Sequence, residues 1–218
     1  MPVDIRAVIF DFGGVLGLPQ DPARVAAMAS LCGLSVEKFR SVYGRDRLEL
    51  DRGTLTAEEY WARILEAGGV EADPGLIARV EREDSLGWTG VNTVVVDWAA
   101  DLRAAGYRTA ILSNMPTSKL SFMRSAGSFD WIDDFRPAIF SCDYLMVKPE
   151  PEIYRLCLEK LALDPAACLF LDDLPRNVEA AQALGIQALY FRSPALDAAA
   201  IEHQWGLPVQ RLRNGSHQ

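Results

Sequence analysis

Residues 7–16 read AVIFDFGGVL and combine a short apolar run with one acidic residue and two adjacent glycines. The run from Ala7 to Phe10 has the length and composition of a buried strand. Asp11 follows directly, so its carboxylate is expected at the carboxyl end of that strand. Because open α/β sheets bind their ligands outside the carboxyl ends of their strands, this stretch predicts where the functional site begins.

Four more β-type runs follow, and a helical segment precedes each of them. The expected strands are residues 7–10, 108–112, 137–141, 168–171 and 187–191, and the helices between them are residues 94–105, 119–126, 151–161 and 176–184. This alternation predicts an α/β fold, a Rossmann-like parallel sheet with helices on both faces. Gly106 and Gly185 directly follow two of these helices, where a left-handed capping residue is favoured.

The segment between the first two strands, roughly residues 21–86, has helical periodicity and no convincing strand. Apolar residues recur there at spacings of three and four, namely Val25, Met28, Ala29 and Cys32, and again Tyr60, Trp61, Ile64 and Leu65. We therefore expect a small all-helical cap domain of residues 17–86 and a core of residues 1–16 and 87–218. The cap leaves and rejoins the sheet at its ligand-binding end, which makes it a candidate lid. Trp88 lies near the return and could line the cleft.

Composition narrows the function classes. The chain has 218 residues, 50% of them hydrophobic, and a formal net charge of −8. Without clustered Lys and Arg, neither a nucleic acid nor a membrane is an expected partner. The chain also lacks a membrane-length apolar stretch and a signal-peptide pattern. Four widely spaced cysteines without a CxxC pair favour reduced, mostly buried thiols and a cytoplasmic setting, whereas nothing indicates the oligomeric state.

Three carboxylates and a lysine fall at equivalent places in the expected sheet. Asp11 ends the first strand, Lys148 follows the third, and Asp172 and Asp173 end the fourth. The carboxyl ends of parallel strands converge, so these side chains are expected together. The like charges would repel one another, and Mg²⁺, which binds one or two carboxylates plus substrate phosphate oxygens, would relieve that repulsion. Lys148 would add positive charge for a phosphate or for the nucleophile.

Each of these residues also has an ordinary structural interpretation. Asp172 and Asp173 could favour the N-terminus of the following helix. Lys148 could be a solvated loop residue, and Ser113 a turn or cap residue. The order and placement of the whole set favour a shared site over these separate roles.

Four segments carry a resemblance that spans nearly the whole chain. They are VIFDFGGVL at residues 8–16, ILSN at 111–114, VKPEPEIY at 147–154 and LFLDDLPRNVEAA at 169–181. In this order they resemble the four motifs of the haloacid dehalogenase (HAD) superfamily. The segment ELDRGTLTAEEYW at 49–61 is similar to members with a helical cap.

The resemblance implies an Mg²⁺-dependent phosphohydrolase that acts on a small phosphorylated metabolite, possibly a sugar phosphate. It implies that Asp11 is both nucleophile and metal ligand, and that the backbone carbonyl of Gly13 also binds the metal. Asp173 would ligate Mg²⁺ directly while Asp172 supports it from the neighbouring position. Adjacent residues at a strand end point to opposite sides, so one direct ligand from this pair is also the physical expectation.

The resemblance also implies roles for three further residues. Ser113 and the backbone of Asn114 would hold the phosphate. Lys148 would balance charge at the nucleophile. The implied partner is a small-molecule phosphate substrate.

One position departs from the family pattern. In most phosphatases of the family the second residue after the nucleophile is an Asp that protonates the leaving alcohol, and here it is Gly13. A missing general acid costs on the order of 10²–10⁴ in rate. Three explanations stay open: a good leaving group such as an anomeric or acyl phosphate, a substitute from the cap (Asp46, Glu49 or Asp51) or water, or a HAD-like binding or regulatory protein with little turnover.

A 2-haloacid dehalogenase is a further alternative, because halide departs without a proton and Asp11 could displace it to form an ester. Those enzymes carry a different first motif and an arginine close behind it. Here Arg24 is the first cation after Asp11. The sequence therefore favours the phosphohydrolase.

Overall fold

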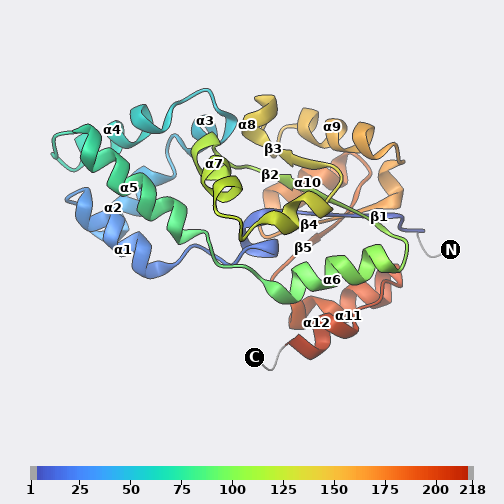
Figure 1. Ribbon diagram of the computed structural model, residues 1–218. Coiled ribbons are helices and arrows are strands. Elements are labelled where there is room, and N and C mark those ends of the chain that lie inside the picture. The colour runs from blue at the N-terminus through green and yellow to red at the C-terminus, as the bar shows by residue number, and fades with distance from the viewer. Residues whose placement is uncertain (1–3, 216–218) are drawn as a thin grey trace.

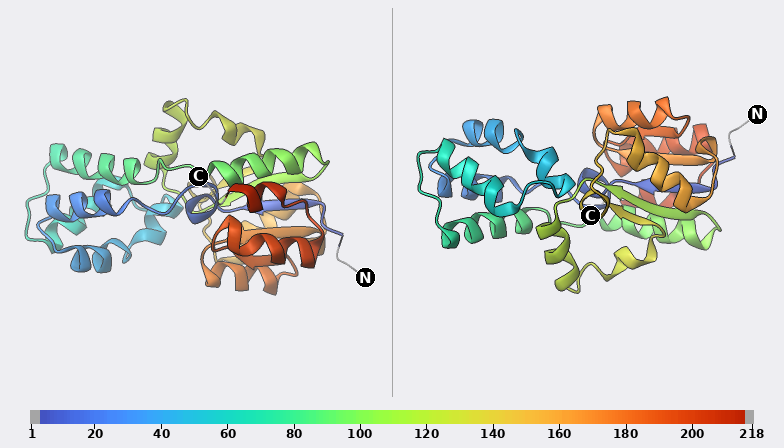
Figure 2. Two further views of the ribbon diagram at one scale, coloured as in Figure 1. Left: turned by 90° about the horizontal axis from the view of Figure 1, so that it is seen from below. Right: turned by 90° about the horizontal axis from the view of Figure 1, so that it is seen from above.

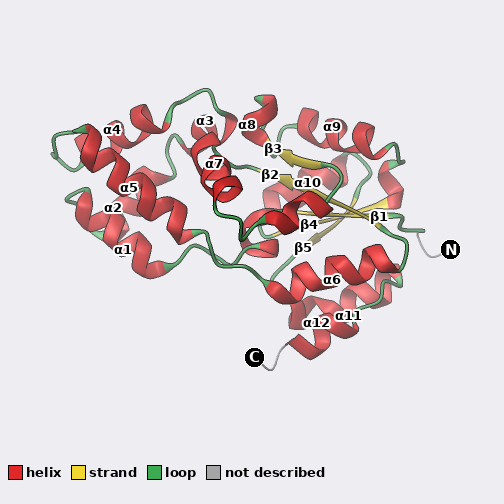
Figure 3. Cartoon of the chain, in the orientation of Figure 1, coloured by secondary structure: helices red, strands yellow, loops and turns green. Residues whose placement is uncertain are grey.

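A parallel five-stranded sheet organises the protein, for which the computed structural model describes residues 4–215. The strands are β1 (Ala7–Phe10), β2 (Arg108–Ser113), β3 (Ala138–Phe140), β4 (Cys168–Asp172) and β5 (Gln187–Tyr190). They lie in the order β3-β2-β1-β4-β5, and every neighbouring pair is parallel (Figure 3). The predicted α/β fold is confirmed, and β1 lies at the centre of the sheet.

Helices that follow the insert along the chain cover both faces of this sheet. They are α6 (Thr93–Ala104), α7 (Thr117–Ser125), α8 (Ser141–Tyr144), α9 (Pro151–Leu161), α10 (Pro175–Ala183), α11 (Pro194–Trp205) and α12 (Gln210–Asn214), with the short helical turns η1 (Phe12–Leu16), η2 (Asp130–Asp134) and η3 (Pro165–Ala167). Side chains of β1 alternate between two cores: Val8 and Phe10 pack with α6, α11 and α12, and Ala7 and Ile9 pack with α9 and α10. Burial on both faces explains the continuous apolar runs.

The predicted helix ends agree with the structure in most places. Gly106 and Gly185 adopt φ of 93° and 83°, the left-handed conformation expected after a helix. Helix α7 begins at Thr117, two residues earlier than expected, and Lys119 is its third residue. Near the other end of the chain, α12 ends at Asn214.

The helical insert between β1 and β2 has a hydrophobic core of its own. It contains α1 (Pro22–Leu31), α2 (Val36–Tyr43), α3 (Arg47–Arg52), α4 (Ala57–Ala67) and α5 (Pro74–Gly87). These helices form the blue to green lobe in Figure 1, and Figure 2 shows this lobe projecting beyond the end of the sheet. Arg52 bridges it to Glu150 of the core with a 2.6 Å ion pair. Among the described residues, no helix is both long and apolar enough to cross a membrane.

Candidate active site

The loop after β1 brings backbone close to the end of β4. Asp11 ends the strand segment, and its Oδ1 accepts a hydrogen bond of 2.6 Å from the amide of Phe12. Gly14 has φ of 73°, and a Cβ there would collide with the carboxylate of Asp173. A glycine is therefore required both by the backbone conformation and by the close approach of the two loops.

The predicted carboxylates form one cluster. Oxygen atoms of Asp11, Asp172 and Asp173 all lie within 4.8 Å of one another. Lys148 Nζ lies 2.8 Å from Asp11 Oδ1 and 2.7 Å from Asp172 Oδ2. Burial opposes charge on this lysine, but Asp11 and Asp172 outweigh it and raise its pKa. One buried lysine thus faces three carboxylates.

This excess of negative charge is visible in the pKa values. Burial raises the pKa of Asp11 to about 7 although Lys148 lowers it, and burial together with the charge of Asp172 raises that of Asp173 to about 6. Carboxylates whose ionisation is disfavoured by burial and by neighbouring carboxylates fit a hard divalent ion such as Mg²⁺, which prefers oxygen ligands. The triad can therefore hold a metal ion.

The two aspartates after β4 have different surroundings. Asp172 is fully buried, and its oxygens accept hydrogen bonds from Lys148 Nζ, the amide of Leu174 at 2.8 Å and Asn177 Nδ2 at 3.0 Å. Asp173 is half-buried and lines the cavity described below. Within the described residues only Asp173 of the pair has a carboxylate open to that cavity.

The loops after β2 and β3 are tied together by Asn114. Its Nδ2 donates to the carbonyl of Lys148 at 2.9 Å, and the amide of Lys148 donates back to Asn114 Oδ1 at 2.8 Å. Ser113, 2% exposed, ends β2 and lines the same cavity. The structure thus brings all the predicted site residues together. It adds one feature the sequence did not indicate, since the Asn114 side chain fixes the loop that carries Lys148.

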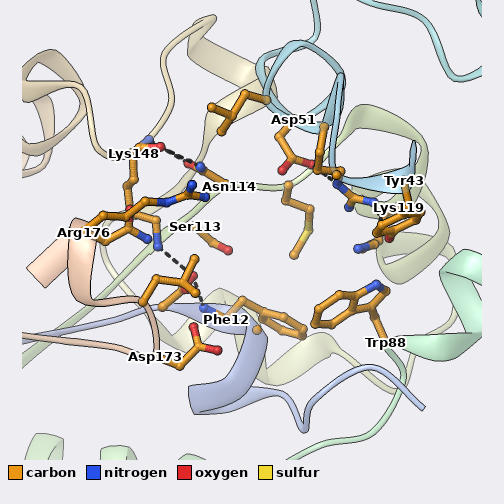
Figure 4. A pocket seen from close by; sticks show the side chains of 18 of the residues that line it. Phe12, Tyr43, Asp51, Trp88, Ser113, Asn114, Lys119, Lys148, Asp173 and Arg176 are labelled. Atoms are coloured by element: carbon orange, nitrogen blue, oxygen red, sulfur yellow. Dashed lines mark hydrogen bonds and ion pairs between the residues drawn. The ribbon is translucent and has the colours of Figure 1, made fainter. Parts of the chain in front are cut away.

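A cavity of about 510 Å³ separates this cluster from the helical insert (Figure 4). On the insert side Arg47 is its main charged residue. This guanidinium pairs with Asp51 at 2.9 Å and Asp84 at 3.4 Å, and it donates to the Tyr43 hydroxyl. Tyr43 in turn donates to Asp84 at 2.6 Å. The wall opposite the carboxylate triad is therefore a hydrogen-bonded network of paired charges.

The residues proposed as substitute acids lie unequally around this cavity. Asp46 does not line it and pairs with Arg63 at 3.1 Å. Glu49 lines it but is exposed, and Asp51 is held by Arg47. Arg24 pairs with Glu83 at 2.7 Å, away from the cavity. Two of the three acidic candidates thus line the cavity, but one of them is exposed and the other is paired with an arginine.

Two lining residues stand where the family pattern is broken. A Cβ at Gly13 would lie 3.1 Å from Trp88 Cζ3, so the indole ring crowds a side chain at that position. Lys119 Nζ lies 4.4 Å from the centre of that ring, and the residue is 5% exposed. Burial, together with the charge of Arg47, lowers the pKa of Lys119 to about 7.

Sequence reasoning placed Trp88 in the cleft as one option and missed Lys119. One signal was available, because a lysine in the first turn of a helix faces the positive end of the helix dipole. The signal was present in the predicted helix as well, since that helix began at Lys119.

The profile of the haloacid dehalogenase-like hydrolase family matches residues 5–185. The chain belongs to this family. As a HAD-like hydrolase it resembles proteins of several architectures. It is 31% identical to acyl-CoA dehydrogenase family member 10 of Mus musculus and 27% identical to bifunctional epoxide hydrolase 2 of Sus scrofa, each over 94% of the chain. It spans only 19% and 40% of the length of these two proteins.

Several relatives of similar length come from bacteria. D-ribitol-5-phosphate phosphatase of Bacteroides thetaiotaomicron is 26% identical over 84% of this chain and 90% of its own. A HAD family enzyme of the same organism has a crystal structure with a TM-score of 0.70 and 26% identity, covering 85% and 92% of the two chains. That enzyme was also crystallised with magnesium and inorganic phosphate. L-2-haloacid dehalogenase of Xanthobacter autotrophicus shares the fold, with a TM-score of 0.65 at 22% identity over 97% and 87% of the chains.

Proposed function

We propose that this HAD-like hydrolase is an Mg²⁺-dependent phosphohydrolase of small phosphorylated metabolites, with Asp11 as nucleophile. The observation that carries the proposal is the position of Asp11. Its carboxylate lies at the cavity, 2.8 Å from Lys148 Nζ and within reach of the other two aspartates. A relative of matching length is named for a sugar-alcohol phosphate phosphatase, which supports a phosphate ester as the substrate class.

The chain's own residues divide the work as follows. Ser113 and the backbone amide of Asn114 hold the phosphate oxygens at the end of β2. Lys148 lowers the pKa of Asp11 against the effect of burial and balances charge around it. An Asp11 oxygen attacks phosphorus, the bond to the leaving oxygen breaks, and water later releases phosphate from Asp11. Mg²⁺, held by Asp11, Asp173 and the Gly13 carbonyl with Asp172 in support, would supply the positive charge that the triad lacks.

In this proposal the helical insert acts as a lid over the active site. We propose residues 17–86 as the cap and residues 1–16 with 87–218 as the catalytic core. Helix α5 ends at Gly87, one residue past that boundary. The four free cysteines, three of them buried, agree with the proposed cytoplasmic setting.

A phosphate-release screen over sugar, nucleotide and acyl phosphates with Mg²⁺ tests the function. We expect turnover that chelation abolishes and that Asp11→Asn reduces to background, while the circular dichroism spectrum stays that of the parent. Retention of more than a few per cent of the activity by Asp11→Asn would refute the nucleophile. Phosphate binding without release from any ester would favour a binding protein, and halide release from 2-chloropropionate would favour a dehalogenase.

A further inference from the structure

The proposed mechanism does not yet assign a residue that donates a proton to the leaving group. Gly13 cannot donate one, and even a Cβ at this position would be crowded by the Trp88 ring. Among the cap carboxylates, Asp51 is committed to Arg47, Asp46 lies outside the cavity, and Glu49 is exposed to solvent. A substitute donor has to line the cavity, carry a proton near neutral pH and lack a tight carboxylate partner.

Lys119 meets these three conditions within the described part of the chain. It lines the same cavity as Asp11 and Ser113, and Figure 4 shows it beside Trp88 on the wall across from Lys148. No carboxylate of residues 4–215 lies within 4.0 Å of its ammonium nitrogen, which rests over the indole ring instead. The ring that crowds position 13 is therefore the ring that supports Lys119.

Burial lowers the cost at which Lys119 gives up its proton, and the surrounding charges act in both directions. Arg47 on α3 repels the ammonium, while Asp51 on α3 and Asp84 on α5 attract it. Burial is the largest effect, and with Arg47 it lowers the pKa to about 7. The first turn of α7, where backbone amides present positive charge, acts in the same direction. An amine with a pKa near the working pH is an effective general acid and base.

We propose that Lys119 is the general acid and base of the reaction, in place of the carboxylate that Gly13 lacks. This inference rests on the proposed function. As the Asp11 oxygen bonds to phosphorus, the bond from phosphorus to the ester oxygen breaks and its electron pair stays on that oxygen. The Lys119 ammonium gives it a proton, so an alcohol and a neutral amine result.

The second half of the cycle restores the lysine. Water attacks phosphorus of the aspartyl-phosphate, and its proton passes to the neutral Lys119 amine. The bond between phosphorus and the Asp11 oxygen breaks, which returns the carboxylate and releases inorganic phosphate. Atoms and charge balance over the two steps without any further reactant.

The test is a series of phosphate monoesters, from alkyl to nitrophenyl, with the parent, Lys119→Met, Lys119→Arg and the control Lys38→Met in saturating Mg²⁺. Lys38 is an exposed lysine of the cap that does not line the cavity. Lys119→Met should slow alkyl esters on the order of 10²–10⁴-fold and nitrophenyl esters less than about tenfold, because only the alkoxide needs the proton. Its dependence of rate on leaving-group pKa should be steeper than that of the parent.

The arginine variant separates charge from proton donation. Arg keeps its proton at neutral pH, so Lys119→Arg should resemble Lys119→Met with alkyl esters. It also serves as the test if the methionine variant does not fold. The parent should lose alkyl-ester activity as pH rises through about 7, and Lys119→Arg should lack that limb.

Each other outcome overturns the inference. Equal losses with all esters in the methionine variant, or full activity of the arginine variant, would show that Lys119 supplies only charge or binding. If the parent releases no phosphate from any ester, the proposed function itself fails and the assignment of Lys119 falls with it. If the parent turns over and Lys119→Met retains its leaving-group dependence, only Lys119 is excluded.

Discussion

Replacement of Gly13 by Asp restores the family's usual acid in sequence, but the structure predicts that it fails without a second change. The Cβ alone would lie 3.1 Å from Trp88 Cζ3, about 0.5 Å inside the optimal separation of two carbon atoms. The carboxylate adds three more heavy atoms, which would have to enter the volume of the ring. Overpacking of this kind typically costs about 1–3 kcal/mol.

The matched variants are Gly13→Ala, Trp88→Ala and Gly13→Asp with Trp88→Ala. Gly13 has φ of −65°, which any residue adopts, so Ala gains about 0.4–1 kcal/mol from the unfolded chain and loses a similar amount against the ring. We expect Gly13→Ala to be within about 1 kcal/mol of the parent. Gly13→Asp should cost about 1–3 kcal/mol in the parent and close to nothing in the Trp88→Ala background.

Urea unfolding in saturating Mg²⁺ measures the free energy of unfolding of the parent and of each variant. Alkyl-phosphate turnover measures the chemistry. The double variant should exceed Trp88→Ala alone in turnover, because its carboxylate has room to act as an acid. The contrary result is that Gly13→Asp leaves the urea midpoint of unfolding unchanged in the parent as well as in Trp88→Ala. In that case the indole ring does not crowd this position. The steric reasoning would then be wrong.

The remaining predictions concern the metal site and the contact between cap and core. Asp173→Ala should weaken Mg²⁺ binding in calorimetry more than Asp172→Ala, and the reverse ranking would overturn Asp173 as the direct ligand. Because burial raises the pKa of Asp173 to about 6 and of Asp11 to about 7, Mg²⁺ affinity should increase as pH rises through this range. By the same shifts, the free energy of unfolding of metal-free protein should decrease between about pH 4 and 7, from the unfolded to the folded pKa values, and a flat profile would contradict them. Arg52→Ala removes a partly exposed ion pair and should cost at most about 1 kcal/mol of thermal stability.

The sheet and the triad could be predicted because the relevant signals are local. β1 and β4 are buried on both faces, so each reads as an uninterrupted apolar run that ends in an acidic residue. Parallel strands bring their carboxyl ends together, and this rule alone places Asp11 beside Asp173. No knowledge of side-chain packing was needed.

The opposite wall could not be predicted because it depends on how the insert packs. Arg47 and Asp84 lie 37 positions apart, and their meeting requires that α3 and α5 be placed in space. Asp46, Glu49 and Asp51 were equal candidates in sequence, yet one faces away, one is exposed and one is paired. Helix geometry turns neighbouring residues to different sides, so a site assigned from a run of acidic residues includes members that never face it.

The glycine at position 13 has a different meaning in the structure than in the sequence. In the sequence, Gly13 indicates that the usual general acid is missing. One interpretation is that the protein has lost turnover. In the structure, Trp88, a residue 75 positions later, crowds the place of a Cβ at position 13, and a buried lysine rests on that ring. A site that had merely lost its acid would have no need to place a desolvated ammonium there, because burying such a group carries a cost that only a partner or a function offsets. The paired arrangement of ring and lysine therefore favours a replaced proton donor over an abandoned one.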